Sequence, residues 1–135
     1  MKNILTIFLV FLSFVAISQC KTEKELCTSL LTSDYISDGQ TYKAMLFGDQ
    51  VAQFDVTFFE KSTYRITGAS GDEKGNLIFT VYDTQGKELF NNVDQMNAPY
   101  WDFVMEASMD ITIEAKLDQK HTDSGCVALL IGFKK

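Results

Sequence analysis

The sequence has little of what a metal, redox or nucleic-acid site requires. Its 135 residues include one histidine, and its three cysteines form no CxxC pair. Cysteines with this spacing and a single histidine do not fit a zinc site or a thiol-redox motif. Basic residues are also scarce, with 12 Lys and Arg against 18 Asp and Glu. Because phosphate contacts need clustered basic side chains, the composition predicts no nucleic-acid partner.

Catalytic motifs are missing as well. No nucleophile elbow, P-loop or dinucleotide fingerprint occurs. His121, Asp123 and Ser124 have the residue types of a hydrolytic triad, but they share one short loop, whereas a triad converges from separate elements. The sequence therefore predicts a protein that is not an enzyme and has no cofactor. A hydrolase that uses two carboxylates, which the sequence does not pair, stays as an alternative.

The longest apolar run lies at the N-terminus. Lys2 precedes it, residues 4–17 are almost wholly apolar, and Ala16 and Ser18 are small residues suited to a signal peptidase. This pattern predicts a signal peptide over residues 1–18. The run is shorter than the roughly 20 residues that span a membrane, so we expect no transmembrane span after cleavage. The mature chain is then exported, to the periplasm or outside the cell, and an uncleaved anchor is the alternative.

The end of this segment, Ile17-Ser18-Gln19-Cys20, resembles a bacterial lipobox. It departs from the lipobox pattern at Gln19, where a small residue is expected. The resemblance implies a lipid on Cys20. It also implies an alternative function for the chain, as a lipid-anchored structural or assembly subunit of the envelope.

Export makes a disulfide the expected state of the cysteines, because the compartment is oxidising. We predict the pair Cys27–Cys126, which would join an early helix to the last strand and close a loop of about 100 residues. Cys20–Cys27 is an alternative that needs Cys20 outside the helix, since seven helical residues span about 10 Å. Three cysteines allow three single bridges in all, and three unpaired thiols are a further alternative.

Period-two alternation dominates the mature chain after one short helix. Thr22 and Glu25 form a capping box, which predicts a helix over about 23–32. Short β-forming segments then recur between turns, at 40–47, 51–59, 62–67, 77–83, 87–90, 100–105, 109–117 and 126–133. About eight such strands predict a single all-β domain over 19–135, an antiparallel two-sheet sandwich with a jelly-roll-like arrangement. The last segment is almost continuously apolar, which indicates a strand that is central or buried on both faces.

The middle of the chain resembles a known family. Tyr64-Arg65-Ile66-Thr67, a Gly-rich loop and the strand and hairpin from Leu77 to Gly86 are similar to the middle of a bacterial pre-peptidase C-terminal domain. The resemblance covers about 40–133. It implies a jelly-roll β-sandwich that serves as an accessory or binding module, and in that family some members hold calcium.

The same region contains the best calcium candidates. Asp72 and Glu73 lie in the Gly-rich loop, and Asp83 begins the next hairpin. Calcium takes six to eight oxygen ligands from carboxylates and carbonyls, so these three acids are the predicted metal ligands. Solvated turn acids are the alternative.

Tyr100 and Trp101 are the predicted binding surface. Strand alternation places Trp101 and Phe103 on one face and Tyr100 and Asp102 on the other. Exposed aromatic rings beside an acid are a common means of holding sugars and proteins, although a lone Trp also fits a core. The sequence as a whole predicts an exported, non-enzymatic binding or accessory module with a protein, peptide or glycan ligand.

Overall fold

The computed structural model describes residues 20–71 and 75–135. The predicted signal peptide (1–18) and two predicted metal ligands, Asp72 and Glu73, lie outside the described residues. No helix within 20–71 or 75–135 is long and apolar enough to cross a membrane.

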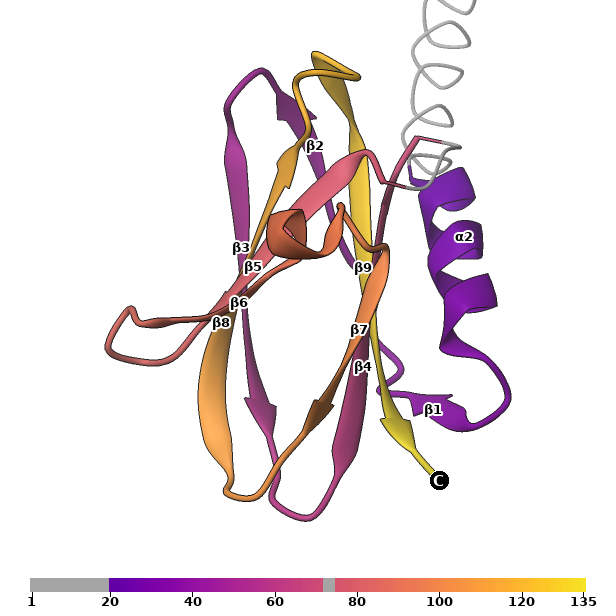
Figure 1. The fold of residues 1–135 in the computed structure, drawn as a ribbon. Helices are drawn as coiled ribbons and strands as arrows, with labels where there is room; N and C mark the ends of the chain where they lie inside the picture. Colours follow the sequence, from indigo (N-terminus) through magenta and orange to yellow (C-terminus); the bar gives the residue numbers. More distant parts are fainter. Residues whose placement is uncertain (1–19, 72–74) are drawn as a thin grey trace, which may run out of the picture.

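The described chain forms two antiparallel sheets that face each other, with one helix on the outside (Figure 1). In chain order the elements are α2 (Lys21–Leu31), β1 (Tyr35–Ser37), β2 (Tyr42–Phe47), β3 (Val51–Phe58), β4 (Thr63–Ser70), β5 (Leu77–Tyr82), β6 (Glu88–Asn91), the 3-10 helix η2 (Asn92–Gln95), β7 (Tyr100–Val104), β8 (Met109–Leu117) and β9 (Ser124–Lys134). The helix begins two residues earlier than predicted, and the three-residue strand β1 was not predicted.

The strand order is that of a jelly roll. One sheet, called sheet A here, has the order β2-β9-β4-β7, with β1 on the same edge of β9 as β2. The other, sheet B, has the order β3-β8-β5-β6. Most connections cross from one sheet to the other, as two interlocked Greek keys require. The predicted all-β sandwich with one N-terminal helix is therefore confirmed.

Strand β9 is the central strand of sheet A, and both of its faces are buried. Its inward residues, Val127, Leu129 and Ile131, join the core between the sheets, where they are at most 2% exposed. Its outward residues include Ala128 and Leu130, which pack under the helix. The continuous apolar run in the sequence reflects these two buried faces.

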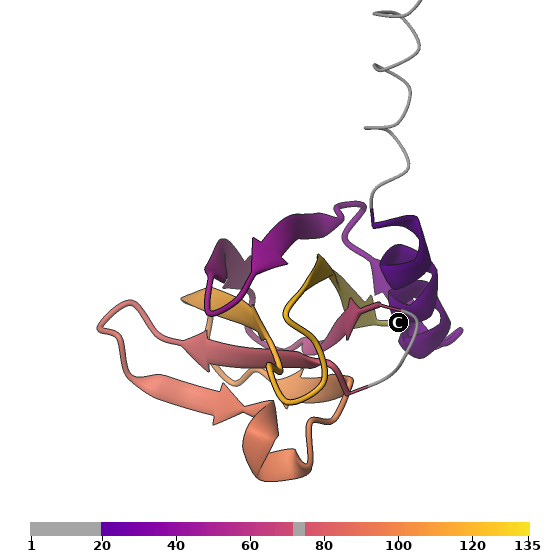
Figure 2. The ribbon, with the colours of Figure 1, turned by 90° about the horizontal axis from the view of Figure 1, so that it is seen from above.

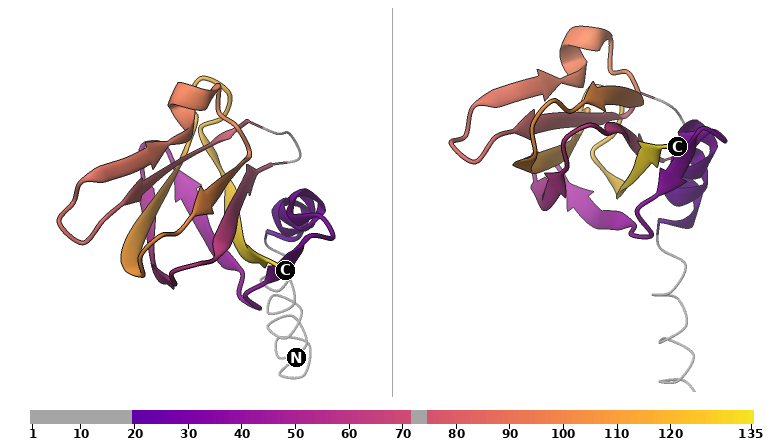
Figure 3. Two further views of the ribbon diagram at one scale, coloured as in Figure 1. Left: turned by 60° about the horizontal axis from the view of Figure 1, so that its bottom comes forward. Right: turned by 90° about the horizontal axis from the view of Figure 1, so that it is seen from below.

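Helix α2 covers the outer face of sheet A. Figures 2 and 3 show it on the side opposite to the projecting β5–β6 hairpin. Cys27 and Leu31 face the sheet and pack against Ala128 and Leu130. Gly132 permits this close approach, because a Cβ there would lie 2.8 Å from a methyl carbon of Leu31.

The disulfide joins Cys20 to Cys126, so the predicted Cys27–Cys126 pair is wrong. Cys20 is the N-cap of α2, and its Cα lies 5.3 Å from that of Cys126. Cys27 is seven residues further along the helix, about 10 Å away, where it faces the next outward position of β9. Its buried thiol donates a hydrogen bond to the Ala128 carbonyl at 3.4 Å.

This arrangement determines the chemistry of both cysteines of the helix region. Burial raises the pKa of Cys27 to about 11, so its thiol stays protonated and unreactive near neutral pH. The Cys20 sulfur is occupied by the disulfide. A thioether-linked lipid on Cys20 and this disulfide therefore exclude each other.

The disulfide gives a direct test of the fold. We expect Cys126→Ala to lower the free energy of unfolding by about 2–4 kcal/mol, because the closed loop includes most of the domain. Cys27→Ala should leave the cross-link intact. Peptide mapping without reductant identifies the pair, and urea unfolding measures the stability. A Cys27–Cys126 peptide in the wild-type digest would contradict this assignment.

Candidate functional site

A break in one edge of sheet A opens the sandwich. β1 pairs with residues 132–134 of β9 and β2 pairs with residues 124–129, so the connecting segment 38–41 departs from the sheet between them. The Asp38 amide still donates to the Ile131 carbonyl at 2.9 Å, which fixes where the segment turns away. The opening faces β3, the edge strand of sheet B.

The result is a cleft of about 450 Å³, called the edge cleft here. Its lining comes from three stretches that are distant in sequence: Asp38, Gln40, Tyr42, Asp55, Val56, Thr57, Phe58, Phe59, Tyr64, Ile131 and Phe133. This volume lies in the range of small-molecule and side-chain binding pockets, which are mostly apolar with a few polar groups.

The floor of the edge cleft is part of the hydrophobic core. Phe58 and Ile131 are each 2% exposed, and the Phe58 ring stacks on Tyr64 with 4.1 Å between centroids. The Tyr64 hydroxyl accepts a hydrogen bond from the Phe59 amide at 3.0 Å, which holds the start of the β3–β4 turn. Phe59 and Phe133 form an exposed apolar rim. A ligand group that enters would therefore meet an apolar surface already held in place by the fold.

The polar groups of the edge cleft are fixed by short-range bonds. The two carboxylate oxygens of Asp38 accept from the Gln40 amide at 2.9 Å and from the Tyr42 hydroxyl at 3.0 Å. Burial, reinforced by Asp38, raises the pKa of Tyr42 to about 12, so this phenol stays neutral. Asp55 accepts from the Thr112 hydroxyl at 2.7 Å. The cleft thus combines apolar walls with carboxylates at its mouth, which suits a ligand group with an apolar body and a donor at its tip.

The outer face of sheet B extends this negative charge. Three cross-strand pairs each join one carboxylate to a neutral donor: Gln53 to Glu114, Thr112 to Asp55 and Thr57 to Asp110. Within the part of the chain that the structure describes, the Arg65–Asp102 ion pair and the His121–Asp118 contact both lie away from this face. Among the described residues, no ion pair neutralises these three carboxylates, which favours a cationic partner.

The structure describes one of the three predicted calcium ligands, Asp83. The described ranges, 20–71 and 75–135, contain no group of three or more His, Cys, Asp or Glu residues placed to hold a metal ion. Asp83 accepts hydrogen bonds from the Gln85 and Lys87 amides, both at 2.9 Å, so its side chain closes its own hairpin. It follows the end of β5, whereas Asp72 and Glu73 precede that strand. A calcium site at these acids stays a prediction.

Tyr100 and Trp101, the predicted binding surface, lie on opposite faces of β7 and contact different neighbours. Trp101 packs on Phe90 at 5.1 Å between centroids and closes the edge between β6 and β7. Tyr100 lies on the outer face of sheet A, against the guanidinium of Arg65. Both rings remain more than a third exposed, at 39% for Tyr100 and 36% for Trp101. A role for either ring in binding stays a prediction.

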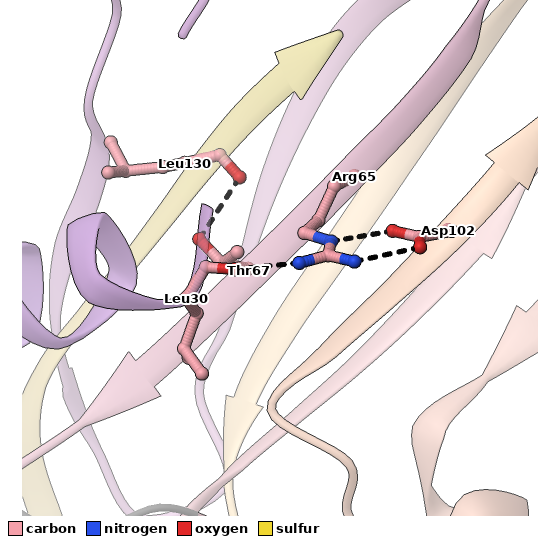
Figure 4. A network of polar contacts seen from close by, with 5 residues as sticks. All are labelled: Leu30, Arg65, Thr67, Asp102 and Leu130. Carbon is pink, nitrogen blue, oxygen red and sulfur yellow. Dashed lines mark hydrogen bonds and ion pairs between the residues drawn. The ribbon is translucent and has the colours of Figure 1, made fainter. Parts of the chain in front are cut away.

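Arg65 connects three elements on the outer face of sheet A (Figure 4). It donates to both carboxylate oxygens of Asp102, at 2.7 and 2.9 Å, and to the Leu30 carbonyl at the end of α2, at 3.0 Å. Its guanidinium carbon also lies 4.3 Å from the ring centroids of Tyr35 and of Tyr100. All of these contacts lie within the chain, so this network holds the helix to the sheet rather than a ligand.

Sequence reasoning missed the edge cleft for a physical reason. Its walls come from segments near residues 40, 57 and 132, which meet only because β9 pairs with β1 and β2 while β3 belongs to the facing sheet. The one local signal is Ser37-Asp38-Gly39, a turn-forming interruption ahead of β2, with Gly39 at a φ of 82°.

Comparisons with known proteins show the fold alone. No protein-family model matches the sequence, and no curated protein matches it either. Among solved structures, the chain is similar to PliG of Aeromonas hydrophila, described as a periplasmic lysozyme inhibitor of g-type lysozyme. That likeness has a TM-score of 0.54 at 13% identity, and covers 70% of this chain and 85% of PliG.

Two further structures match less well. One is a de novo designed double-stranded β-helix, with a TM-score of 0.36 at 14% identity over 70% of this chain and 99% of the design. The other is the P-domain of Penaeus vannamei nodavirus, with a TM-score of 0.29 at 10% identity over 68% of this chain and 94% of the domain.

The Arg65 network predicts a pH-dependent term in stability. Hydrogen bonds from Arg65 lower the pKa of Asp102, so this carboxyl stabilises the fold above its unfolded pKa of about 3.9, and the contribution is lost as the pH falls through the lower folded value. We expect Asp102→Asn to cost about 1 kcal/mol at pH 7, because solvent screens the exposed pair. In thermal scans, the difference in unfolding temperature between wild type and variant should be constant from pH 8 to 5 and become smaller below about pH 4. A difference in unfolding temperature that stays the same below pH 4 would contradict this account.

Proposed function

We propose that this protein is an exported, non-enzymatic module that binds a protein, and that its edge cleft receives a side chain of that partner. The observation that carries the proposal is the cleft itself, which joins an apolar floor continuous with the core to an exposed aromatic rim. Export rests on the predicted signal peptide over residues 1–18. An accessory or binding role is also what the resemblance to pre-peptidase C-terminal domains implies.

The chemistry of the cleft supports a protein partner. Interface energy concentrates where a large side chain enters a desolvated apolar pocket surrounded by a rim that excludes water. Phe59 and Phe133 supply such a rim over the buried Ile131. The carboxylates of Asp38 and Asp55 at the mouth favour a partner that is basic next to its entering side chain.

The first partner to test is a g-type lysozyme. PliG of Aeromonas hydrophila shares the sandwich fold and is described as an inhibitor of that enzyme. The shared fold supports placing this chain among exported modules that bind enzymes. Inhibition of a lysozyme is the specific form of the proposal that is easiest to measure.

The chain offers a matched pair of variants for this test. Phe59 lies on the rim of the edge cleft and Phe47 lies at the end of β2 outside it, and each is 60% exposed. We expect Phe59→Ala to weaken partner binding at least about tenfold, since it removes rim contacts, and Phe47→Ala to leave binding within about twofold. Immobilised wild type and both variants are exposed to purified g-type lysozyme and to an envelope extract of the host, with quantitative mass spectrometry of what is retained.

The outcomes separate the two parts of the proposal. A protein that is retained by wild type and Phe47→Ala but lost from Phe59→Ala supports binding through the cleft, whether or not it is a lysozyme. Retention of lysozyme without inhibition of its activity would contradict the inhibitor role. If soluble glycan fragments bind in the cleft and no protein shows this pattern, the protein-binding proposal is wrong.

A further inference from the structure

The connection between β6 and β7 holds its backbone in an unfavourable conformation. Met96 has φ 56° and ψ 42°, and Asn97 follows with φ 54°. Two successive residues with a Cβ thus occupy the left-handed region, which such residues avoid. Strain of this kind persists only where surrounding bonds fix it, and it is concentrated at functional sites.

The side chain of Asn92 makes the first set of hydrogen bonds that fix this loop. Strand β6 pairs with Thr80–Tyr82 of β5 and ends there, so the Leu77–Phe79 part of β5 extends past it. The fully buried Asn92 side chain forms hydrogen bonds with that part of β5 in place of a strand partner. It accepts from the Phe79 amide at 2.9 Å and donates to the Leu77 carbonyl at 2.9 Å and to the Ala98 carbonyl at 3.1 Å.

Asn97 ties the other end of the loop to its neighbours. Its side-chain amide donates to the Gly75 carbonyl at 3.0 Å and to the carboxylate of Asp118 at 2.8 Å. Asp118 is itself buried, and its second oxygen accepts from the Lys120 amide at 3.1 Å. The loop is therefore joined to two other connections at the same end of the sandwich.

This framework holds an apolar side chain out in water. Met96 is 95% exposed, the most exposed large apolar residue in the described ranges, and Val93 beside it is 49% exposed. Both border a surface hollow of about 520 Å³ that also includes Ile78 and His121. A side chain that packs on nothing, at the tip of a strained and firmly braced loop, contributes nothing visible to the stability of the fold.

We propose that residues 92–98 form an insertion loop whose Met96 enters an apolar pocket on a protein partner. A loop fixed in its bound shape loses little conformational freedom on association, which is the benefit of pre-organisation. The unbranched thioether of Met adapts to pockets of irregular shape. Asp94 stands two residues from Met96, and Lys120 lines the same hollow, so the partner pocket that fits carries both a basic and an acidic group on its rim. The inference does not depend on the edge cleft.

Glycine substitution separates a binding role from a structural one. Glycine favours the left-handed region, so Met96→Gly keeps the loop conformation and the folding temperature while it removes the side chain. Lys61→Gly is the matched control, because Lys61 is an exposed residue with φ 62° in the β3–β4 turn. A photo-cross-linking amino acid in place of Lys120, which lines the same hollow as Met96, reports contact in the exported protein within its host.

We expect the wild-type and Lys61→Gly backgrounds to cross-link one protein other than this chain. The yield should fall at least about tenfold in Met96→Gly, with the folding temperature retained in both glycine variants. Equal yield in Met96→Gly would overturn the inference. A cross-link only to lipid or only to a second copy, or no cross-link in the wild-type background, would overturn it as well.

Discussion

Strand β9 is the constraint on which the rest of the structure depends. It is buried on both faces and paired along both edges, so four separate parts of the molecule meet on its eleven residues. Its inner face supplies the core, its outer face receives α2, one edge holds β4 and the other holds β1 and β2. The edge cleft exists because the last of these edges is covered by two short strands instead of one long strand.

Period-two alternation made most of the fold predictable, since residues on one face of each strand had to reach a shared core. The apolar run of β9 likewise identified a central strand. The disulfide partner was not predictable in this way. Whether Cys20 or Cys27 reaches Cys126 depends on the position of the helix along β9. Local sequence patterns do not encode this position, which depends on contacts between distant residues such as the close approach of Leu31 to Gly132.

The candidate site was less predictable than the fold, for a related reason. The pattern of aromatic residues next to an acid drew attention to Tyr100. In the structure the Tyr100 ring packs against Arg65, which is 35 residues away along the chain and also bonds to α2 and β7. In the sequence, Asn92 lies between the predicted strands 87–90 and 100–105, and its role as a substitute for a missing strand partner requires knowing where β6 ends. Both cases depend on pairing between distant segments, which no window of sequence shows.

The disulfide has a consequence for how the domain withstands proteolysis. Cys20 and Cys126 are 106 positions apart, so the cross-link turns nearly the whole domain into a covalent ring. Each exposed turn between them, including the projecting β5–β6 hairpin, is a place where a foreign protease could cut the chain. A single cut in any of these turns would open the ring without releasing a fragment, and the two sheets would still hold the pieces in register. After such a cut the two pieces of this domain stay covalently joined, whereas a sandwich without the cross-link would hold them by non-covalent contacts alone.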